Sequence, residues 1–413
     1  MATLDGRNSS NDLLNGGSGD DIYLHNPGTS GHDVITDAGG ADIVKFNLAN
    51  LPYVLPAGWD LYRNGNDLVF DFYSRGSLTI AGQFSTSVPV IETLQEVDDF
   101  IFGPLTFQNS LVGTAVNDVI VGTASADTIF GGAGNDIIGG GAGNDTMSGD
   151  AGNDIMLGGI GNDTLNGGAD NDLLFGGAGQ DTLSGDAGSD YLDGGVQTDL
   201  LNYTDANYVS YQSSTAGVYV NLSGISGVGN TGFGVATDGM GGTDTLLNIS
   251  RVVGSIHNDT LTGSSALLLE IFDGGLGNDI IDGGMITDAL NGANSNRVTY
   301  QNATGAVVVN LATGTTTGAA GNDTLININA AWGSGYDDVL TGSDRTDVTE
   351  QFLGRGGNDT IDGAGGYDLV SYEDATGPVN VSLTAGTATG NASVGTDSLL
   401  NIEAIRGSSF NDI

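Results

Sequence analysis

The sequence predicts an all-β protein whose centre is a parallel solenoid of stacked, flattened coils. Ten unbroken nine-residue units run from Thr114 to Tyr203, and an aspartate holds the fifth place of every unit. An apolar residue stands two places after each aspartate, and a glycine closes each of the first nine units. Loop aspartates have no physical reason to keep such a register, whereas a stacked coil places equivalent residues one above another.

The composition agrees with an ordered, acidic repeat. Of 413 residues 71 are glycine, and the 38% that are hydrophobic recur periodically, which argues against a disordered linker. The 51 acidic and nine basic residues give a net charge of −42, which excludes nucleic acid as a partner and favours cations. Cysteine is absent, so neither disulfides nor thiolate ligands contribute.

The ends of the chain carry no targeting signal that the sequence reveals. No stretch approaches 18 continuous apolar residues, which predicts that the chain has no transmembrane segment. The first residues lack the basic and apolar regions of a secretory signal peptide. The sequence stops at Ile413 inside a repeat unit, and we expect it to be an excerpt of a longer protein.

Each nine-residue unit is predicted to form one half of a coil. In Gly131-Gly132-Ala133-Gly134 the glycines allow a turn through positive φ, and a three-residue strand with an inward Ile138 follows. Two units then make one coil of 18 residues, so alternate units stack. The apolar residues form two facing ladders, one of Ile120, Ile138, Met156, Leu174 and Leu192 and the other of Ile129, Met147, Leu165, Leu183 and Leu201.

The same geometry brings the aspartates together at the two edges of the coil. Stacked carboxylates one strand spacing apart, roughly 4.8 Å, repel by about 3 kcal/mol per pair at an effective dielectric near 20. A cation is therefore required. Calcium fits because it accepts six to eight oxygen ligands, carboxylates and backbone carbonyls alike, in flexible geometry. Magnesium prefers stricter octahedra, and zinc or copper would want the histidine and cysteine that this chain hardly has.

Two units quoted in full, Gly140-Gly141-Ala142-Gly143-Asn144-Asp145-Thr146-Met147 and Gly158-Gly159-Ile160-Gly161-Asn162-Asp163-Thr164-Leu165, resemble the nonapeptide of haemolysin-type calcium-binding (RTX) proteins. The resemblance implies a parallel β-roll that holds several calcium ions through the aspartate and the carbonyls of the second and fourth turn positions. The implied ligands in regular turns are Gly132, Gly134, Asp136, Gly141, Gly143, Asp145, Gly159, Gly161, Asp163, Gly177, Gly179 and Asp181.

Further ligands are expected where the turn departs from this pattern. Asp150, Asp170 and Asp186 replace a turn glycine, but a carbonyl ligand survives a change of side chain if the backbone still turns. The ligands expected in these turns, in the first units and in shorter runs of the repeat are Gly152, Asp154, Gly168, Asp172, Gly188, Asp190, Asp127, Asp21, Asp279 and Asp359.

The rest of the chain predicts β structure on both sides of the roll. Residues 1–45 carry a short run of the repeat, and residues 46–112, with a hairpin turn at Asn64-Gly65, resemble a haemolysin-type calcium-binding-related β domain. The roll occupies 113–203. Three strand modules follow at 204–295, 296–371 and 372–413, the first two with a short nonad run and the third truncated.

Each module has two anchors at fixed spacing. A tyrosine precedes a leucine by eleven residues with alternating valines between them, and two aspartates follow 15 residues apart. The tyrosines are Tyr211, Tyr300 and Tyr372, and the aspartate pairs are Asp244 and Asp259, Asp323 and Asp338, and Asp397 and Asp412.

The sequence does not predict an enzyme. It contains neither a His-Glu-x-x-His helix nor a Gly-x-Ser-x-Gly elbow, and its three histidines are scattered. Two functions remain open. One is a structural, secretion-supporting segment of an exported adhesin or matrix protein that folds on calcium. The other is a calcium-dependent carrier region of a secreted enzyme or toxin whose catalytic domain lies outside this chain.

The RTX resemblance also implies a location. It implies type I secretion to the extracellular space or cell surface of a Gram-negative bacterium, where sites of roughly 10⁻⁴ to 10⁻³ M affinity fill. Tyrosines on an exposed face of the solenoid leave a carbohydrate or cell-surface partner possible.

Overall fold

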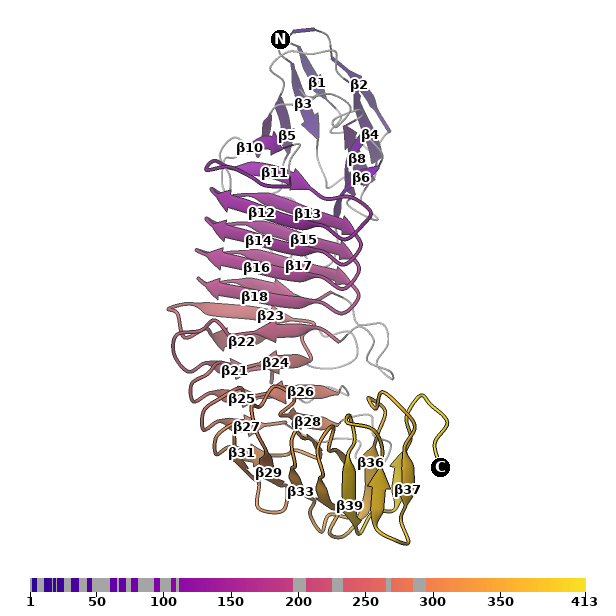
Figure 1. Ribbon diagram of the computed structural model, residues 1–413. Coiled ribbons are helices and arrows are strands. Elements are labelled where there is room, and N and C mark those ends of the chain that lie inside the picture. Colours follow the sequence, from indigo (N-terminus) through magenta and orange to yellow (C-terminus); the bar gives the residue numbers. More distant parts are fainter. Residues whose placement is uncertain are drawn as a thin grey trace. The chain divides into compact units, whose positions relative to one another are not determined.

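The computed structural model describes residues 111–413, except for gaps at 196–205, 225–232, 265–268 and 285–294, and the strands and short adjoining segments within residues 2–108. The described residues form strands, turns and bends, and none of them lies in a helix (Figure 1). None therefore forms a helix that could cross a membrane. The chain divides into two compact units, Met1–Gln197 (unit 1) and Thr198–Ile413 (unit 2).

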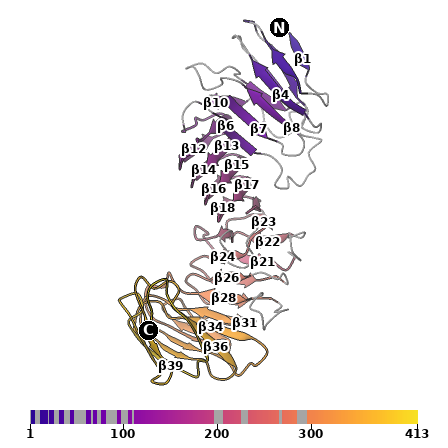
Figure 2. The same cartoon turned by 90° about the vertical axis from the view of Figure 1, so that its right-hand side faces the viewer.

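The central part of unit 1 is the predicted two-layered parallel roll. One layer is β11-β13-β15-β17-β19 and the other is β12-β14-β16-β18, with every neighbouring pair parallel (Figure 2). The strands of the roll are β11 (Asp118–Val121), β12 (Thr128–Ala133), β13 (Ile137–Ala142), β14 (Thr146–Ala151), β15 (Ile155–Ile160), β16 (Thr164–Ala169), β17 (Leu173–Ala178), β18 (Thr182–Ala187) and β19 (Tyr191–Asp193).

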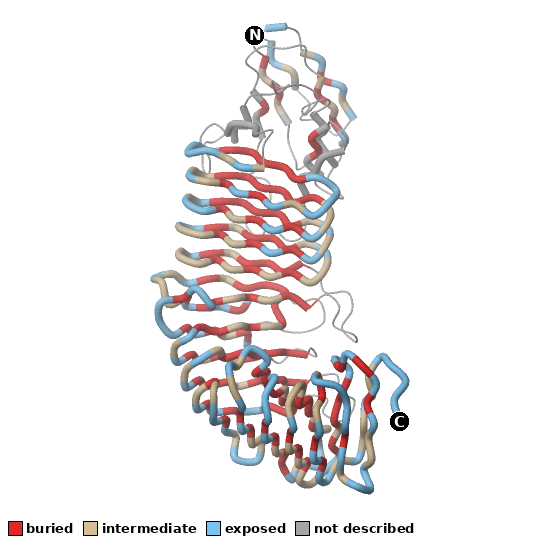
Figure 3. The backbone as a smooth tube through the Cα atoms, viewed as in Figure 1, coloured by how far each residue is buried: buried red, intermediate tan, exposed pale blue. Residues whose placement is uncertain are grey.

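Both predicted apolar ladders are confirmed over the described residues. Ile138 pairs in register with Ile120 and Met156, and Leu174 with Met156 and Leu192. In the facing layer Met147 pairs with Ile129 and Leu165. Every described member of the two ladders is at most 1% exposed, and Figure 3 shows this buried line running through the middle of each coil. Leu201 lies outside the described residues.

The strands are longer than the sequence predicts, six residues in most coils instead of three. The ladder continues into the glycine turn, where Gly132 pairs with Asp150 and Ala133 with Ala151. The prediction was wrong because it treated each glycine pair as the end of a strand. Positive φ at Gly132 (99°) bends the chain while the hydrogen bonds of the next residues persist.

The N-terminal part of unit 1 extends one layer of the roll, through the pairing of β10 with β11, and contains one further sheet. β1, β3 and β5 are parallel rungs, and β2 and β4 are parallel in a sheet that continues through β8, β7 and β6. β6 and β7 form the antiparallel pair expected from the Asn-Gly turn. The strands are β1 (Thr3–Asp5), β2 (Leu13–Asn15), β3 (Ile22–His25), β4 (Gly31–Thr36), β5 (Ile43–Phe46), β6 (Asp60–Asn64), β7 (Asp67–Asp71), β8 (Gly76–Ile80), β9 (Thr93–Glu96) and β10 (Leu105–Gln108).

One layer of unit 2 is a parallel sheet in the order β20-β24-β26-β28-β32-β34-β36-β40. Its strands are β20 (Tyr208–Ser210), β24 (Arg251–Val253), β26 (Glu270–Asp273), β28 (Asn296–Thr299), β32 (Ala330–Trp332), β34 (Thr349–Leu353), β36 (Tyr367–Ser371) and β40 (Ala404–Arg406).

The second layer of unit 2 contains three antiparallel meanders, one in each region where the sequence predicts a strand module. Each module adds an antiparallel meander, β21-β22-β23, β29-β30-β31 or β37-β38-β39, and β21 and β29 then pair in parallel with the next rung. The strands are β21 (Tyr219–Asn221), β22 (Gly234–Thr237), β23 (Thr243–Leu247), β25 (Thr260–Thr262), β27 (Ile280–Asp282), β29 (Val307–Asn310), β30 (Thr315–Gly318), β31 (Thr324–Ile326), β33 (Val339–Thr341), β35 (Thr360–Asp362), β37 (Asn380–Ser382), β38 (Thr387–Thr389) and β39 (Thr396–Leu400).

Candidate metal centre

The turns at both edges of the roll hold a stack of buried carboxylates. On one edge the backbone N–H of Asp136 donates to Oδ1 of Asp154 at 2.7 Å, and that of Asp154 donates to Oδ1 of Asp172 at 2.8 Å. On the other edge the N–H of Asp145 donates to Oδ1 of Asp163 at 2.8 Å. One oxygen of each carboxylate is thus fixed to the preceding turn, which offsets part of the predicted repulsion.

In four of these aspartates the second carboxylate oxygen has no donor among the described residues. Oδ2 of Asp136, Asp145, Asp154 and Asp172 is buried and accepts no hydrogen bond from the residues that the structure describes. The four side chains are at most 1% exposed. Burying an ionised oxygen without a partner costs more than a typical hydrogen bond returns, so these positions require either a proton or a cation.

The glycines make the space in which such a cation would lie. A β-carbon on Gly149 would lie 2.2 Å from Oδ2 of Asp154, so only glycine leaves that oxygen room. A β-carbon on Gly161 would lie 1.6 Å from the carbonyl oxygen of Gly143, which shows that this fourth-position carbonyl faces the next turn. The carbonyl oxygen of Gly167 would lie 2.6 Å from the same β-carbon on Gly149, so a carboxylate and a carbonyl oxygen border one gap, which is a donor set that suits calcium.

The raised pKa values of the aspartates along one edge indicate that their ionised forms need a nearby positive charge. Burial raises the pKa of Asp136 to about 6, of Asp154 to about 7 and of Asp172 to about 8, and neighbouring carboxylates raise these values further while the backbone N–H donors lower them. On the other edge burial raises the pKa of Asp181 to about 7. Protons and cations would therefore compete for these oxygens near neutral pH.

A family model described as the RTX calcium-binding nonapeptide repeat matches the segments where this geometry occurs. The matches cover 8–26, 27–47, 112–147, 140–174, 148–183, 166–201 and 270–294. The chain therefore contains RTX calcium-binding repeats in these segments. Its repeats are calcium-binding repeats, and the repeat itself is a structural element with no catalytic chemistry of its own.

Similarity to solved structures is weaker than the family match. The extracellular lipase LipA from Serratia marcescens is similar over 59% of this chain and 37% of the lipase chain, with 19% identity and a TM-score of 0.17. The RTX chain thus spans little more than a third of that lipase's length. No curated protein matches it.

The RTX turns have the backbone conformation that the predicted carbonyl ligands need. All predicted glycine ligands have positive φ, from 98° at Gly141 to 156° at Gly188. Asp150, Asp170 and Asp186 turn in the same way, with φ of 74°, 78° and 61°. The turns at Asp154, Asp172 and Asp190 therefore keep the shape of the glycine turns, as expected, and their part in binding calcium stays a prediction.

The predicted ligands outside the regular turns differ from one another. Asp279 and Asp359 match the roll, because each has a buried Oδ2 without a donor among the described residues, and burial raises the pKa of each to about 8. Oδ1 of Asp21 accepts the N–H of Ala2 at 2.6 Å. Asp127 is distinct, because its Oδ2 accepts both the N–H and the hydroxyl of Thr123, at 2.6 and 2.9 Å.

Two features of the RTX edges escaped the sequence analysis. Asparagines stand before most of the aspartates and form a second ladder, in which Asn153 N–H donates to Oδ1 of Asn135 and Asn171 N–H to Oδ1 of Asn153. The repeated Asn-Asp pair is the signal that predicts it. Asp368 also has a buried Oδ2 without a described donor, beside Gly363, and burial raises its pKa to about 7.

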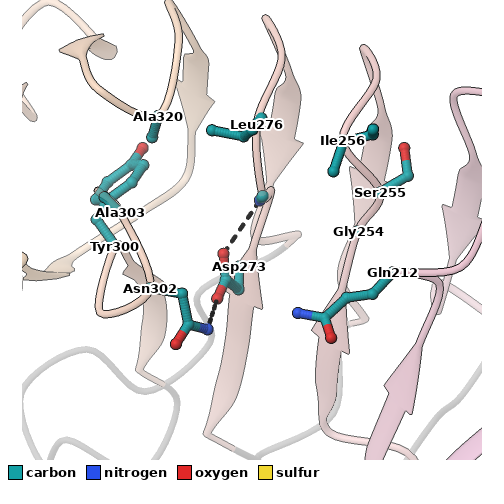
Figure 4. Close-up of a pocket in the computed structure, with 11 residues that line it drawn as sticks. Gln212, Gly254, Ser255, Ile256, Asp273, Leu276, Tyr300, Asn302, Ala303 and Ala320 are labelled. Atoms are coloured by element: carbon teal, nitrogen blue, oxygen red, sulfur yellow. Dashed lines mark hydrogen bonds between the residues drawn. The ribbon is translucent and has the colours of Figure 1, made fainter. Parts of the chain in front are cut away.

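Unit 2 also contains a cavity of about 180 Å³ that spans neighbouring rungs (Figure 4). Its polar groups are engaged with the protein. Asp273 accepts the N–H of Gly275 at 3.1 Å and the side-chain amide of Asn302 at 2.9 Å, and the Tyr300 hydroxyl donates to Asp323. The lining residues include no histidine, cysteine or lysine. The buried carboxylates of the RTX turns are thus a better candidate for the functional site.

The raised pKa values predict how pH affects the metal-free RTX roll. An aspartate whose pKa rises from 3.8 to about 8 on folding favours the folded state at low pH, and this contribution is lost as pH rises towards 8. In chelator the full chain should therefore show more β structure by circular dichroism at pH 5 than at pH 8. Excess calcium should reduce this difference, and greater order at pH 8 in chelator would contradict the assignment.

Proposed function

We propose that this chain is a calcium-ordered structural segment of an exported protein of the adhesin or matrix type, and that it is not an enzyme. The observation that carries the proposal is the stack of buried aspartate oxygens that have no donor among the described residues, in turns lined by glycine. A calcium ion between successive turns would supply the missing charge and take its other ligands from turn carbonyls.

The folding of the roll then depends on the calcium concentration of the compartment in which the chain lies. The stacked carboxylates oppose folding where calcium is scarce, and millimolar calcium outside the cell converts the same groups into ligands whose binding energy stabilises the folded state. This supports export of the chain while its repeats are unfolded, and hence an extracellular or cell-surface location reached by type I secretion.

Circular dichroism of the full chain tests the proposal directly. In chelator at pH 8 we expect the spectrum to lack most of the roll's β contribution, and in about 5 mM calcium we expect that contribution to appear. Magnesium at the same concentration is the matched control, because it prefers a smaller and stricter octahedron. Identical spectra with calcium and chelator, or equal ordering by magnesium, would refute calcium-dependent folding.

A further inference from the structure

The aspartates of the two units fall into two classes according to the partner of the second carboxylate oxygen. In the first class this oxygen is buried without a described donor. In the second it accepts the backbone N–H of a serine or threonine four places earlier, and the hydroxyl of that residue also donates to the carboxylate. The first class contains Asp136, Asp145, Asp154, Asp172, Asp279, Asp359 and Asp368, and the second contains Asp118, Asp127, Asp259, Asp338 and Asp412 with a serine or threonine donor.

The residue four places before the aspartate separates the two classes. In the first class it has positive φ whatever its side chain, as at Gly132 (99°), Asp150 (74°) and Arg355 (72°). In the second class it is a serine or threonine, and none of these five residues has positive φ. Its N–H and hydroxyl both turn onto the carboxylate: Ser334 donates its N–H to Oδ2 of Asp338 at 2.5 Å and its hydroxyl at 3.0 Å.

In the strand modules of unit 2 a tyrosine hydroxyl supplies the donor to the second carboxylate oxygen. The hydroxyl groups of Tyr211, Tyr300 and Tyr372 donate to Oδ2 of Asp244, Asp323 and Asp397, at 3.0, 2.9 and 3.0 Å. Asp323 is otherwise placed like an aspartate of the roll, because its Oδ1 accepts the N–H of Asp279. The tyrosine hydroxyl thus lies at the oxygen that has no donor in the glycine turns.

We propose that these serine, threonine and tyrosine donors replace calcium at their rungs, so that a turn binds calcium only where the residue four places before its aspartate has positive φ. The inference rests on the proposed function and refines it. It makes Asp127, which the sequence predicts as a ligand, a calcium-independent cap at the start of the roll, and it adds Asp368 to the calcium sites. The order of a turn then depends on calcium only where the residue four places before the aspartate has positive φ.

Hydrogen exchange of the full chain, read by mass spectrometry in calcium and in chelator, tests this rung by rung. In the wild type we expect chelation to accelerate exchange in 132–190 and to leave 334–341 protected. Ser334→Ala should accelerate exchange in 334–341 about tenfold or more in both conditions, since a charged acceptor loses its hydroxyl donor. Ser334→Gly should accelerate it in chelator only, because glycine permits the calcium-binding turn.

Thr341→Val, on the strand that follows Asp338, is the matched control and should leave the exchange of its neighbours unchanged. Equal loss of protection in 132–190 and 334–341 on chelation would overturn the hydroxyl replacement while leaving calcium-dependent folding intact. Unchanged exchange in Ser334→Ala would also overturn it. If chelation changes exchange nowhere, calcium-dependent folding fails instead, and Ser334→Ala still tests the cap because its effect does not require calcium.

Discussion

Gly161→Ala should destabilise the roll by more than about 2 kcal/mol even in saturating calcium. Gly161 has φ of 143°, which a residue with a side chain rarely adopts, and its β-carbon would lie 1.6 Å from the carbonyl oxygen of Gly143. Since the obstructing atom belongs to backbone, relief requires the two turns to separate. That separation would also move a carbonyl predicted to bind calcium, so stability and calcium affinity should fall together.

Urea unfolding of the full chain in calcium, followed by circular dichroism, measures this effect. The matched control is Gly335→Ala, because Gly335 has no heavy atom within 4 Å of an added β-carbon and no positive φ. We expect that control to change stability by less than about 0.5 kcal/mol. Equal effects of the two substitutions would mean that close stacking of the turns does not limit the roll.

The period alone predicted the coil, the two apolar ladders and their register. These follow from the sequence because each depends on residues a fixed distance apart: Ile138 meets Met156 only if 18 residues make one coil. Strand length was not predicted correctly, because a glycine can either end a strand or bend a strand that continues beyond it. Gly132 ends an extended run in most proteins, but here it bends a ladder whose hydrogen bonds continue to Ala133.

The hydroxyl partners of the carboxylates could not be predicted for a different reason. The tyrosine and aspartate anchors of the modules were both visible in the sequence, but Tyr211 and Asp244 are 33 residues apart, and only the meander between them brings the hydroxyl to the carboxylate. Thr123 stands where regular units of the repeat have a glycine. Threonine at this position does more than replace glycine, because its N–H and hydroxyl both donate to the carboxylate of Asp127.

Asp172→Asn should change stability in opposite directions with and without calcium. In chelator at pH 8 the substitution removes a buried charge whose pKa burial raises to about 8, so the variant should be more stable than the wild type. In calcium it removes a carboxylate predicted to bind the ion, so the calcium concentration at the folding midpoint should rise about tenfold or more. A purely structural aspartate would show only one of these effects.

Asp170→Asn controls for net charge in the same turn. Asp170 is exposed, and its φ of 78° is a conformation that asparagine also tolerates. The control should leave the calcium midpoint nearly unchanged, because the carbonyl that would bind calcium is retained. If Asp172→Asn instead lowers stability equally in chelator and calcium, the hydrogen bond from Asp154 N–H to its Oδ1, at 2.8 Å, outweighs the charge, and the ion lies elsewhere. The reversal of sign between the two conditions is thus what separates a ligand from a structural acceptor.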